Sequence, residues 1–142
     1  MRIIIDADAC PSITKIEGIA KKYCLECLIF CDYNHHITSD FSTVNIIGSG
    51  YQSVDMAIIN QVKKDDIVIT QDYGLATLVL SKEGYAINPN GMIYNSSNID
   101  HLMNIRHVKA KIRNYSHLKG PKKRTKQDES NLIKNIIYLI TK

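Results

Sequence analysis

Four aspartates stand at positions of the sequence where carboxylates commonly bind metal ions. Asp6 and Asp8 follow the β-branched run Ile3–Ile5. Asp72 follows a second such run, Ile67–Thr70, by two residues. In an open parallel α/β sheet, ligands bind beyond the carboxyl ends of the strands, where the connecting loops diverge. We therefore expect these three carboxylates to lie together at that edge of the sheet.

Asp55 is placed by helical spacing rather than by a strand. It precedes Ile59 and Val62 by four and seven residues, so the three side chains share the helix face that turns toward the core. A carboxylate is costly to bury, but Asp55 lies in the first turn, where the helix N-terminus favours negative charge. That end of a crossover helix lies near the carboxyl edge of the sheet, so all four aspartates can meet in one cleft.

Carboxylates that meet in one cleft repel one another and raise one another's pKa, so such a group usually holds a cation. Oxygen ligands alone favour Mg²⁺ or Mn²⁺. An ordinary alternative applies to each residue taken singly, because Asp at strand ends and helix starts also forms turns and caps. The metal interpretation therefore depends on the convergence of all four residues.

The order of the predicted elements is that of an α/β domain. Short β-branched or apolar runs predict five strands, at Arg2–Ile5, Leu25–Cys31, Thr43–Ile47, Ile67–Thr70 and Tyr85–Asn88. Helical spacing predicts helices within residues 11–23, 53–62, 75–80, 97–112 and 126–140. Capping-box signatures open the last two helices, Ser97 with Asp100 and Thr125 with Asp128. Strands that alternate with helices indicate parallel pairing, and the length predicts a single domain over residues 1–142.

The charge of the chain is unevenly distributed. Residues 1–105 hold seven Lys or Arg and twelve Asp or Glu, whereas residues 106–126 hold nine Lys or Arg and no acid. Such a local excess attracts polyanions, so nucleic acid is the expected partner of this basic segment. No aromatic residue interleaves its densest part, which predicts contact with phosphates rather than with particular bases. The candidate nucleic-acid-binding residues are Lys119, Lys122, Lys123, Arg124 and Lys126.

The sequence indicates a cytoplasmic protein without a membrane partner. It shows no export signal, and no apolar run approaches the roughly 18 residues of a membrane span, so the four cysteines should be reduced. The spacing of Cys24, Cys27 and Cys31 with His35 or His36 also resembles a zinc site. This alternative is disfavoured, because Cys27 and Cys31 share one face of a strand, where cysteine behaves as a small apolar residue.

Five motifs carry a resemblance to a known family. They are Asp6–Ala–Asp8–Ala–Cys10–Pro11, Ser53–Val–Asp55, Ile69–Thr–Gln–Asp72–Tyr–Gly–Leu–Ala76, Asn88–Pro–Asn–Gly91 and Lys119–Gly–Pro–Lys–Lys–Arg–Thr–Lys126. In this order, over nearly the whole chain, they resemble the bacterial YaiI/YqxD family, which is grouped with PIN-like domains. The resemblance implies a three-layer PIN-like α/β fold with a mostly parallel central sheet and helices on both faces.

The resemblance also implies a chemistry. PIN-like sheets gather acidic residues around Mg²⁺ or Mn²⁺ to cleave RNA. Asp6, Asp55 and Asp72 would then bind the cation, with Asp8 as a fourth catalytic acid, in a nuclease whose substrate is RNA. Asp128, which follows the basic segment, is interpreted as a capping residue rather than as a ligand.

Two other functions fit parts of the pattern. A strand that ends in Asp-x-Asp also opens haloacid-dehalogenase-type phosphatases, in which Asp6 would be the nucleophile and Asp8 the general acid. That alternative is weaker, because Ala9–Cys10–Pro11 continues the motif poorly and because Asp65 and Asp66 precede their strand. The third candidate is a non-catalytic RNA-binding module, in which the basic segment binds phosphate and the acids have no catalytic role. Metal-dependent turnover would distinguish the enzymes from the module.

Overall fold

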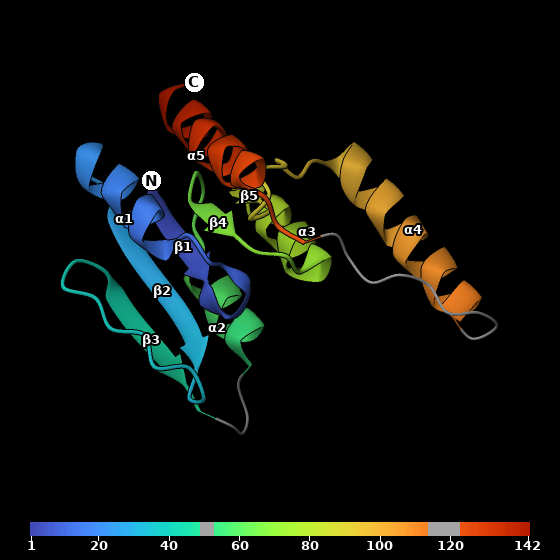
Figure 1. Cartoon of the computed structure of the whole chain (residues 1–142), viewed down its shortest axis with the longest axis horizontal. Coiled ribbons are helices and arrows are strands. Elements are labelled where there is room, and N and C mark those ends of the chain that lie inside the picture. Colours follow the sequence, from blue (N-terminus) through green and yellow to red (C-terminus); the bar gives the residue numbers. More distant parts are fainter. Residues whose placement is uncertain (49–52, 114–122) are drawn as a thin grey trace.

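The centre of the structure is a sheet of five parallel strands. The computed structural model describes residues 1–48, 53–113 and 123–142 (Figure 1). Its strands are β1 (Arg2–Asp6), β2 (Glu26–Asp32), β3 (Thr43–Ile47), β4 (Ile67–Ile69) and β5 (Tyr85–Ile87). They lie in the order β3-β2-β1-β4-β5, and each neighbouring pair is parallel. The five predicted strands are confirmed, with bounds that differ by at most one residue at either end.

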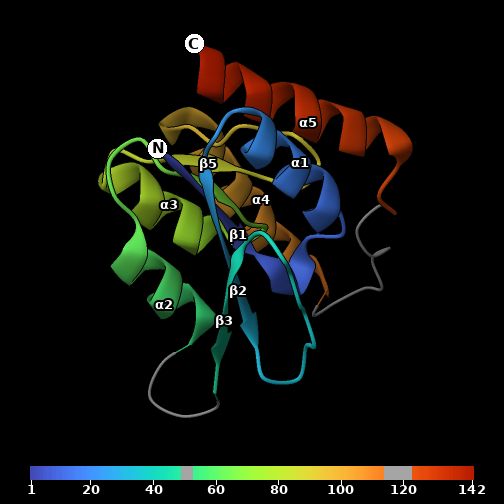
Figure 2. The same ribbon diagram turned by 90° about the vertical axis from the view of Figure 1, so that its left-hand side faces the viewer.

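Helices cover both faces of the sheet. They are α1 (Ile13–Lys22), α2 (Val54–Gln61), α3 (Tyr73–Ser81), α4 (Ser96–Arg113) and α5 (Lys126–Thr141), with a short 3-10 helix, η1 (Ala7–Ala9), after β1. Figures 1 and 2 show α1 and α5 on one face and α2 and α3 on the other, with α4 beside α3. This arrangement confirms the expected three-layer α/β fold.

Alternate residues of each strand fill two separate cores. In β1, Ile3 and Ile5 belong to the core shared with α1 and α5, whereas Ile4 belongs to the core shared with α2 and α3. All three side chains are fully buried, and each contributes roughly 1.5–3 kcal/mol to folding by leaving water. Burial on both faces explains why β1 and β4 are continuous β-branched runs rather than alternating ones.

The strand order reverses at β1, which lies between β2 and β4. From β1 the chain moves outward through β2 and β3, and then returns through α2 to β4 on the other side of β1. Because Ile5 pairs with Ile69, the next residues of the two strands, Asp6 and Thr70, emerge side by side. In doubly wound sheets this switch point is the usual place for a ligand.

Capping side chains fix where the later helices begin. The capping box that begins at Thr125 is present at the start of α5, as predicted. The box predicted for Ser97 and Asp100 is wrong. Asn95 and Asn98 form it instead, two residues earlier, because each side-chain oxygen accepts a 2.8 Å hydrogen bond from the other residue's backbone nitrogen. None of the described helices combines the length and apolar character needed to cross a membrane.

Candidate functional site

Asp6 is the buried carboxylate of the site. It ends β1 and is only 8% exposed. Its Oδ2 accepts a 2.8 Å hydrogen bond from Oγ1 of Thr70, which is fully buried directly after β4. Burial raises the pKa of Asp6, the Thr70 hydroxyl opposes this shift, and the charges of Asp8 and Asp72 raise the pKa further. Asp6 is therefore fixed in position, and its charged form is disfavoured by the other carboxylates.

Asp72 caps the helix that follows it. Its Oδ1 accepts hydrogen bonds from the backbone nitrogens of Gly74 at 2.8 Å and Leu75 at 3.2 Å. Its own backbone nitrogen donates to Oγ1 of Thr70 at 3.0 Å, so one hydroxyl connects Asp6 to the Asp72 loop. The capping alternative is thus correct for Asp72, and the cap itself fixes a carboxylate at the carboxyl edge of the sheet.

Asp55 brings a third carboxylate to the same edge from α2. It lies in the first turn of that helix, is half-buried, and forms a side-chain hydrogen bond with Asp72. Burial, this hydrogen bond and the charges of Asp72, Asp6 and Asp8 raise the pKa of Asp55 to about 7. Two carboxylates can share a hydrogen bond only when one of them carries a proton. The metal-free site therefore keeps a proton that an isolated aspartate would lose.

Asp8 lies at the exposed end of the site, in η1. Its Oδ1 lies 3.2 Å from Nδ1 of His35 and accepts a 3.3 Å hydrogen bond from the backbone nitrogen of Asp32. His35 Nδ1 also lies 2.7 Å from Oδ1 of Asp32, and this hydrogen bond lowers the pKa of Asp32 and raises the pKa of His35. One donor atom from each of the three residues lies within 4.8 Å of the others, so they could share a cation.

The four predicted aspartates all come from segments at the carboxyl edge of the sheet, and we call the group the acidic row. It comprises Asp55 on α2, Asp72 after β4, Asp6 at the end of β1 and Asp8 in η1. The charges of the other three residues all act on Asp55, so the four lie within electrostatic range of one another. Asp55 and Asp72 line one cavity, whereas Asp8 turns toward Asp32 and His35.

Comparisons with known proteins identify a family and no activity. The family model described as "Uncharacterized BCR, YaiI/YqxD family" matches residues 4–142. The chain belongs to the YaiI/YqxD family. A UPF0178 protein of Clostridium tetani is 50% identical over 143 residues, covering 100% of this chain and 98% of the relative. A UPF0178 protein of Clostridium kluyveri is 49% identical over 141 residues, covering 99% and 93%. No solved structure is significantly similar.

Three residues that contact the acidic row of this YaiI/YqxD protein are not identified by the sequence analysis. Thr70 is not identified because the sequence pattern predicts it as the last residue of a strand. Asp32 ends β2 as Asp6 ends β1, so the strand-end argument could have found it. His35 is considered in the sequence only with the cysteines, whereas its side chain contacts Asp8 and Asp32.

The predicted nucleic-acid-binding residues of this YaiI/YqxD protein are only partly described. Lys119 and Lys122 lie outside the described residues. Lys123 and Lys126 are exposed near the start of α5, and Arg124 is half-buried. Lys123 and Arg124 line a cavity that also reaches the loop after β4, so two of the predicted cations lie close to the acidic row.

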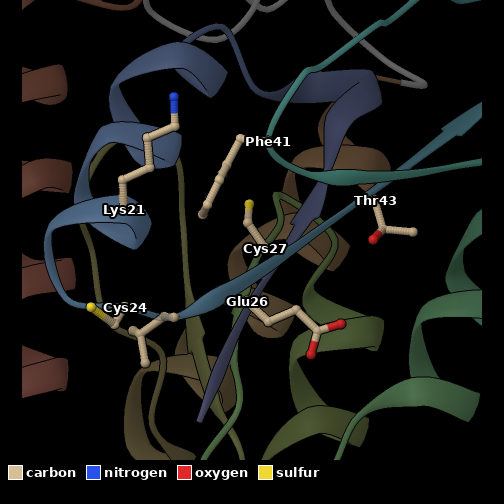
Figure 3. A pocket seen from close by; sticks show the side chains of 7 residues that line it. Lys21, Cys24, Glu26, Cys27, Phe41 and Thr43 are labelled. Carbon is tan, nitrogen blue, oxygen red and sulfur yellow. The ribbon is translucent and has the colours of Figure 1, made fainter.

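A second cavity lies at the opposite edge of the sheet. It has a volume of about 470 Å³, and residues near the amino ends of β2 and β3 line it (Figure 3). The ammonium of Lys21 lies 5.2 Å from the centre of the Phe41 ring at this cavity.

Burial raises the pKa of the Cys27 thiol to about 11. Cys27 and Cys31 both belong to the core, which confirms that they act as small apolar residues.

Proposed function

We propose that this YaiI/YqxD protein is a Mg²⁺- or Mn²⁺-dependent nuclease that hydrolyses the phosphodiester bonds of RNA. Asp6, Asp55 and Asp72 would bind the cation, with Asp8 as a fourth catalytic acid. The observation that carries the proposal is the hydrogen bond between the carboxylates of Asp55 and Asp72, within range of the other two acids. RNA is chosen over DNA because of the resemblance to PIN-like domains, and the basic segment supports a polyanionic substrate of either kind.

The donor set fits a hard divalent cation. All four side chains offer carboxylate oxygens, which are the ligands that Mg²⁺ and Mn²⁺ favour. In the metal-free protein a proton offsets part of the repulsion at Asp55, whose pKa is raised to about 7 by burial and by Asp72. A divalent cation offsets the same repulsion more completely, so its binding should release that proton near neutral pH.

The residues of the site would provide positioning rather than a nucleophile. Thr70 holds one oxygen of Asp6, and the first-turn amides of α3 hold one oxygen of Asp72, so both carboxylates have fixed orientations. Asp8 is the most exposed of the four acids, so a strand that approaches from solvent would meet it first. A bound Mg²⁺ or Mn²⁺ supplies neutralisation of phosphoryl charge and activation of a water molecule. No Ser, His or Cys nucleophile is then required.

Cation binding and RNA cleavage should be lost together when one carboxylate of the row is replaced. The test is a time course on labelled single-stranded RNA, with Mn²⁺ and with EDTA, and titration calorimetry with Mn²⁺ on the same samples. The variants are Asp6→Asn and Asp72→Asn, and Asn caps helices well enough to keep α3 intact. Asp40→Asn is the matched control, because Asp40 is exposed next to Phe41 at the opposite edge of the sheet.

Three results would reject the proposal. Equal cleavage by wild type, Asp6→Asn and Asp72→Asn would assign the activity to a contaminant. A phosphorylated Asp6 would support the phosphatase alternative instead. RNA binding without turnover, in either Mg²⁺ or Mn²⁺, would support the non-catalytic module.

A further inference from the structure

A polar cavity of about 510 Å³ adjoins the acidic row and has no part in the proposed metal site. Its walls come from three segments far apart in the sequence: the loop after β4, the turn after β5 and the start of α5. Gln71 and Tyr73 line it on the β4 side, and these two residues flank Asp72. A ligand in this cavity would therefore lie next to the acidic row.

Two cations give the cavity a positive wall. Lys123 is exposed, and neither Lys123 nor Arg124 forms an ion pair with any of the described residues. Both stand directly before α5, whose N-terminus adds a partial positive charge. One acid, Asp128, also lines the cavity. Its Oδ2 accepts a hydrogen bond from the backbone nitrogen of Thr125 in the capping box. Two cations against one acid leave the lining attractive to an anion.

Neutral groups hold Arg124 in place. Its Nη2 donates to Oγ of Ser12 at 2.9 Å and to the carbonyl oxygen of Pro89 at 3.1 Å. Its Nε is buried and has no hydrogen-bond partner among the described residues. The direct acceptors are neutral, and Glu129, an acid whose charge interacts with Arg124, accepts a hydrogen bond from Ser12 and does not line the cavity. The planar set of donors on the guanidinium matches phosphate well.

The turn after β5, which lines the cavity, is fixed against α5. Gly91 ends the turn that carries Asn88 and Asn90, and its φ is +97°. A Cβ at this position would lie 2.6 Å from Asn131, so a side chain cannot be accommodated where the turn packs on the helix. Nδ2 of Asn135 also donates to the carbonyl oxygen of Gly91 at 2.6 Å. This wall of the cavity is therefore held in place without a ligand, which reduces the entropic cost of binding.

We propose that this cavity binds a phosphate group of a nucleic acid strand, next to the phosphate that reaches the acidic row. The inference rests on the proposed function, because the nuclease assignment makes a strand the source of the phosphate. Lys123 and Arg124 are assigned as the cations that contact it. The acidic row by itself repels the backbone of a strand, so a cationic cavity on its flank supplies an attraction that the row lacks.

RNA binding in the absence of metal tests the cavity separately from catalysis. The affinity of a short single-stranded RNA is measured by fluorescence anisotropy in EDTA over a range of salt concentrations. The proteins are wild type, Lys123→Gln, Arg124→Gln and the control Lys134→Gln, and Lys134 is exposed in the middle of α5, outside the cavity. Each phosphate contact contributes about 0.7 to the slope of log affinity against log salt for a single strand. We expect that loss in the first two variants and none in the control.

Arg124→Gln could also disturb folding, because Arg124 contacts Ser12 and Pro89. Lys123→Gln removes only an exposed side chain, so its slope decides the test if the Arg124 variant is unfolded. A second readout is the Nε–H resonance of Arg124 in a nitrogen-15 spectrum, identified by its loss in Arg124→Lys. We expect this resonance to shift on addition of the RNA and also on addition of inorganic phosphate.

An unchanged slope for Lys123→Gln with an unmoved Arg124 resonance would overturn the proposal. An equal loss of slope in Lys134→Gln would show that the salt dependence follows the overall charge of the protein, and this result would also overturn the proposal. A resonance that responds to inorganic phosphate but not to RNA would assign the cavity to a small phosphorylated ligand, against the proposal. Failure of the proposed function looks different: Mn²⁺ binding and turnover would be absent while the results in EDTA remained.

Discussion

Replacing Asp55 by asparagine removes the carboxylate that is least compatible with its neighbours. Its pKa is raised to about 7 from an ordinary value of 3.8, first by burial and then by the hydrogen bond and charge of Asp72. Between these two pH values the folded protein keeps a proton that the unfolded chain releases. The stability of the metal-free protein therefore falls as the pH rises from about 4 to about 7, because the folded state binds more protons. Asp55→Asn should abolish most of this loss of stability between about pH 4 and about pH 7.

The size of the effect follows from the shift and from the exposure of Asp55. A pKa of about 7 in place of 3.8 corresponds to about 4 kcal/mol if no solvent screens the charge. Asp55 is only half-buried, so screening by water reduces the expected gain of Asp55→Asn at pH 8 to about 1–2 kcal/mol. For a chain of this length the gain corresponds to a rise in Tm of about 3–8 °C.

The assay is urea unfolding of wild type and Asp55→Asn at pH 5 and pH 8, in EDTA and at low salt. Asp40→Asn serves as the control, because it removes an exposed carboxylate at the other edge of the sheet. The variant should gain stability over wild type at pH 8 and gain much less at pH 5. If Asp55→Asn is no more stable than wild type at pH 8, or gains equally at both pH values, the carboxylates do not repel one another as argued.

Three further predictions concern groups away from Asp55. NMR titration should find the pKa of His35 above its ordinary 6.5, because Asp32 accepts a hydrogen bond from it, and Asp32→Asn should return the midpoint toward 6.5. Asp66→Ala should destabilise the protein to urea by about 3–5 kcal/mol, because Asp66 is the buried partner of a salt bridge at the amino edge of the sheet. Gly91→Ala should lower the Tm and reduce the free energy of unfolding by about 1–3 kcal/mol, because φ at this position is +97° and a Cβ would lie 2.6 Å from Asn131. Unchanged values in any one assay would contradict the corresponding contact.

The positions of the acids could be predicted where a local pattern determines them. Burial on both faces produces uninterrupted β-branched runs, so the ends of β1 and β4 could be located, and with them Asp6 and Asp72. Asp55 could be placed because its spacing from Ile59 fixes a helix face, and the two residues line one cavity in the structure. These inferences need only one element at a time, together with the rule that parallel strands end at a common edge.

The lateral order of the strands could not be predicted in this way. Thr70 contacts Asp6 because β4 lies beside β1, and Asp8 contacts Asp32 because β2 lies on the other side of β1. No periodicity within a segment encodes which strand becomes its neighbour. The same limit applies to Arg124, whose neighbours at the cavity come from the loops after β4 and β5, far from it in the sequence.

The acidic row and the cationic cavity act in opposite directions on the same proposed ligand. In the metal-free protein the charges of Asp6 and Asp72 oppose the approach of a strand, whereas Lys123 and Arg124 attract it. A divalent cation on the row would remove the first effect and leave the second. Cation and strand would then strengthen each other's binding, and by the same factor, because linkage between two binding sites is reciprocal. On this argument the arrangement of charge alone makes strand binding depend on the cation, with no further contact between the two ligands.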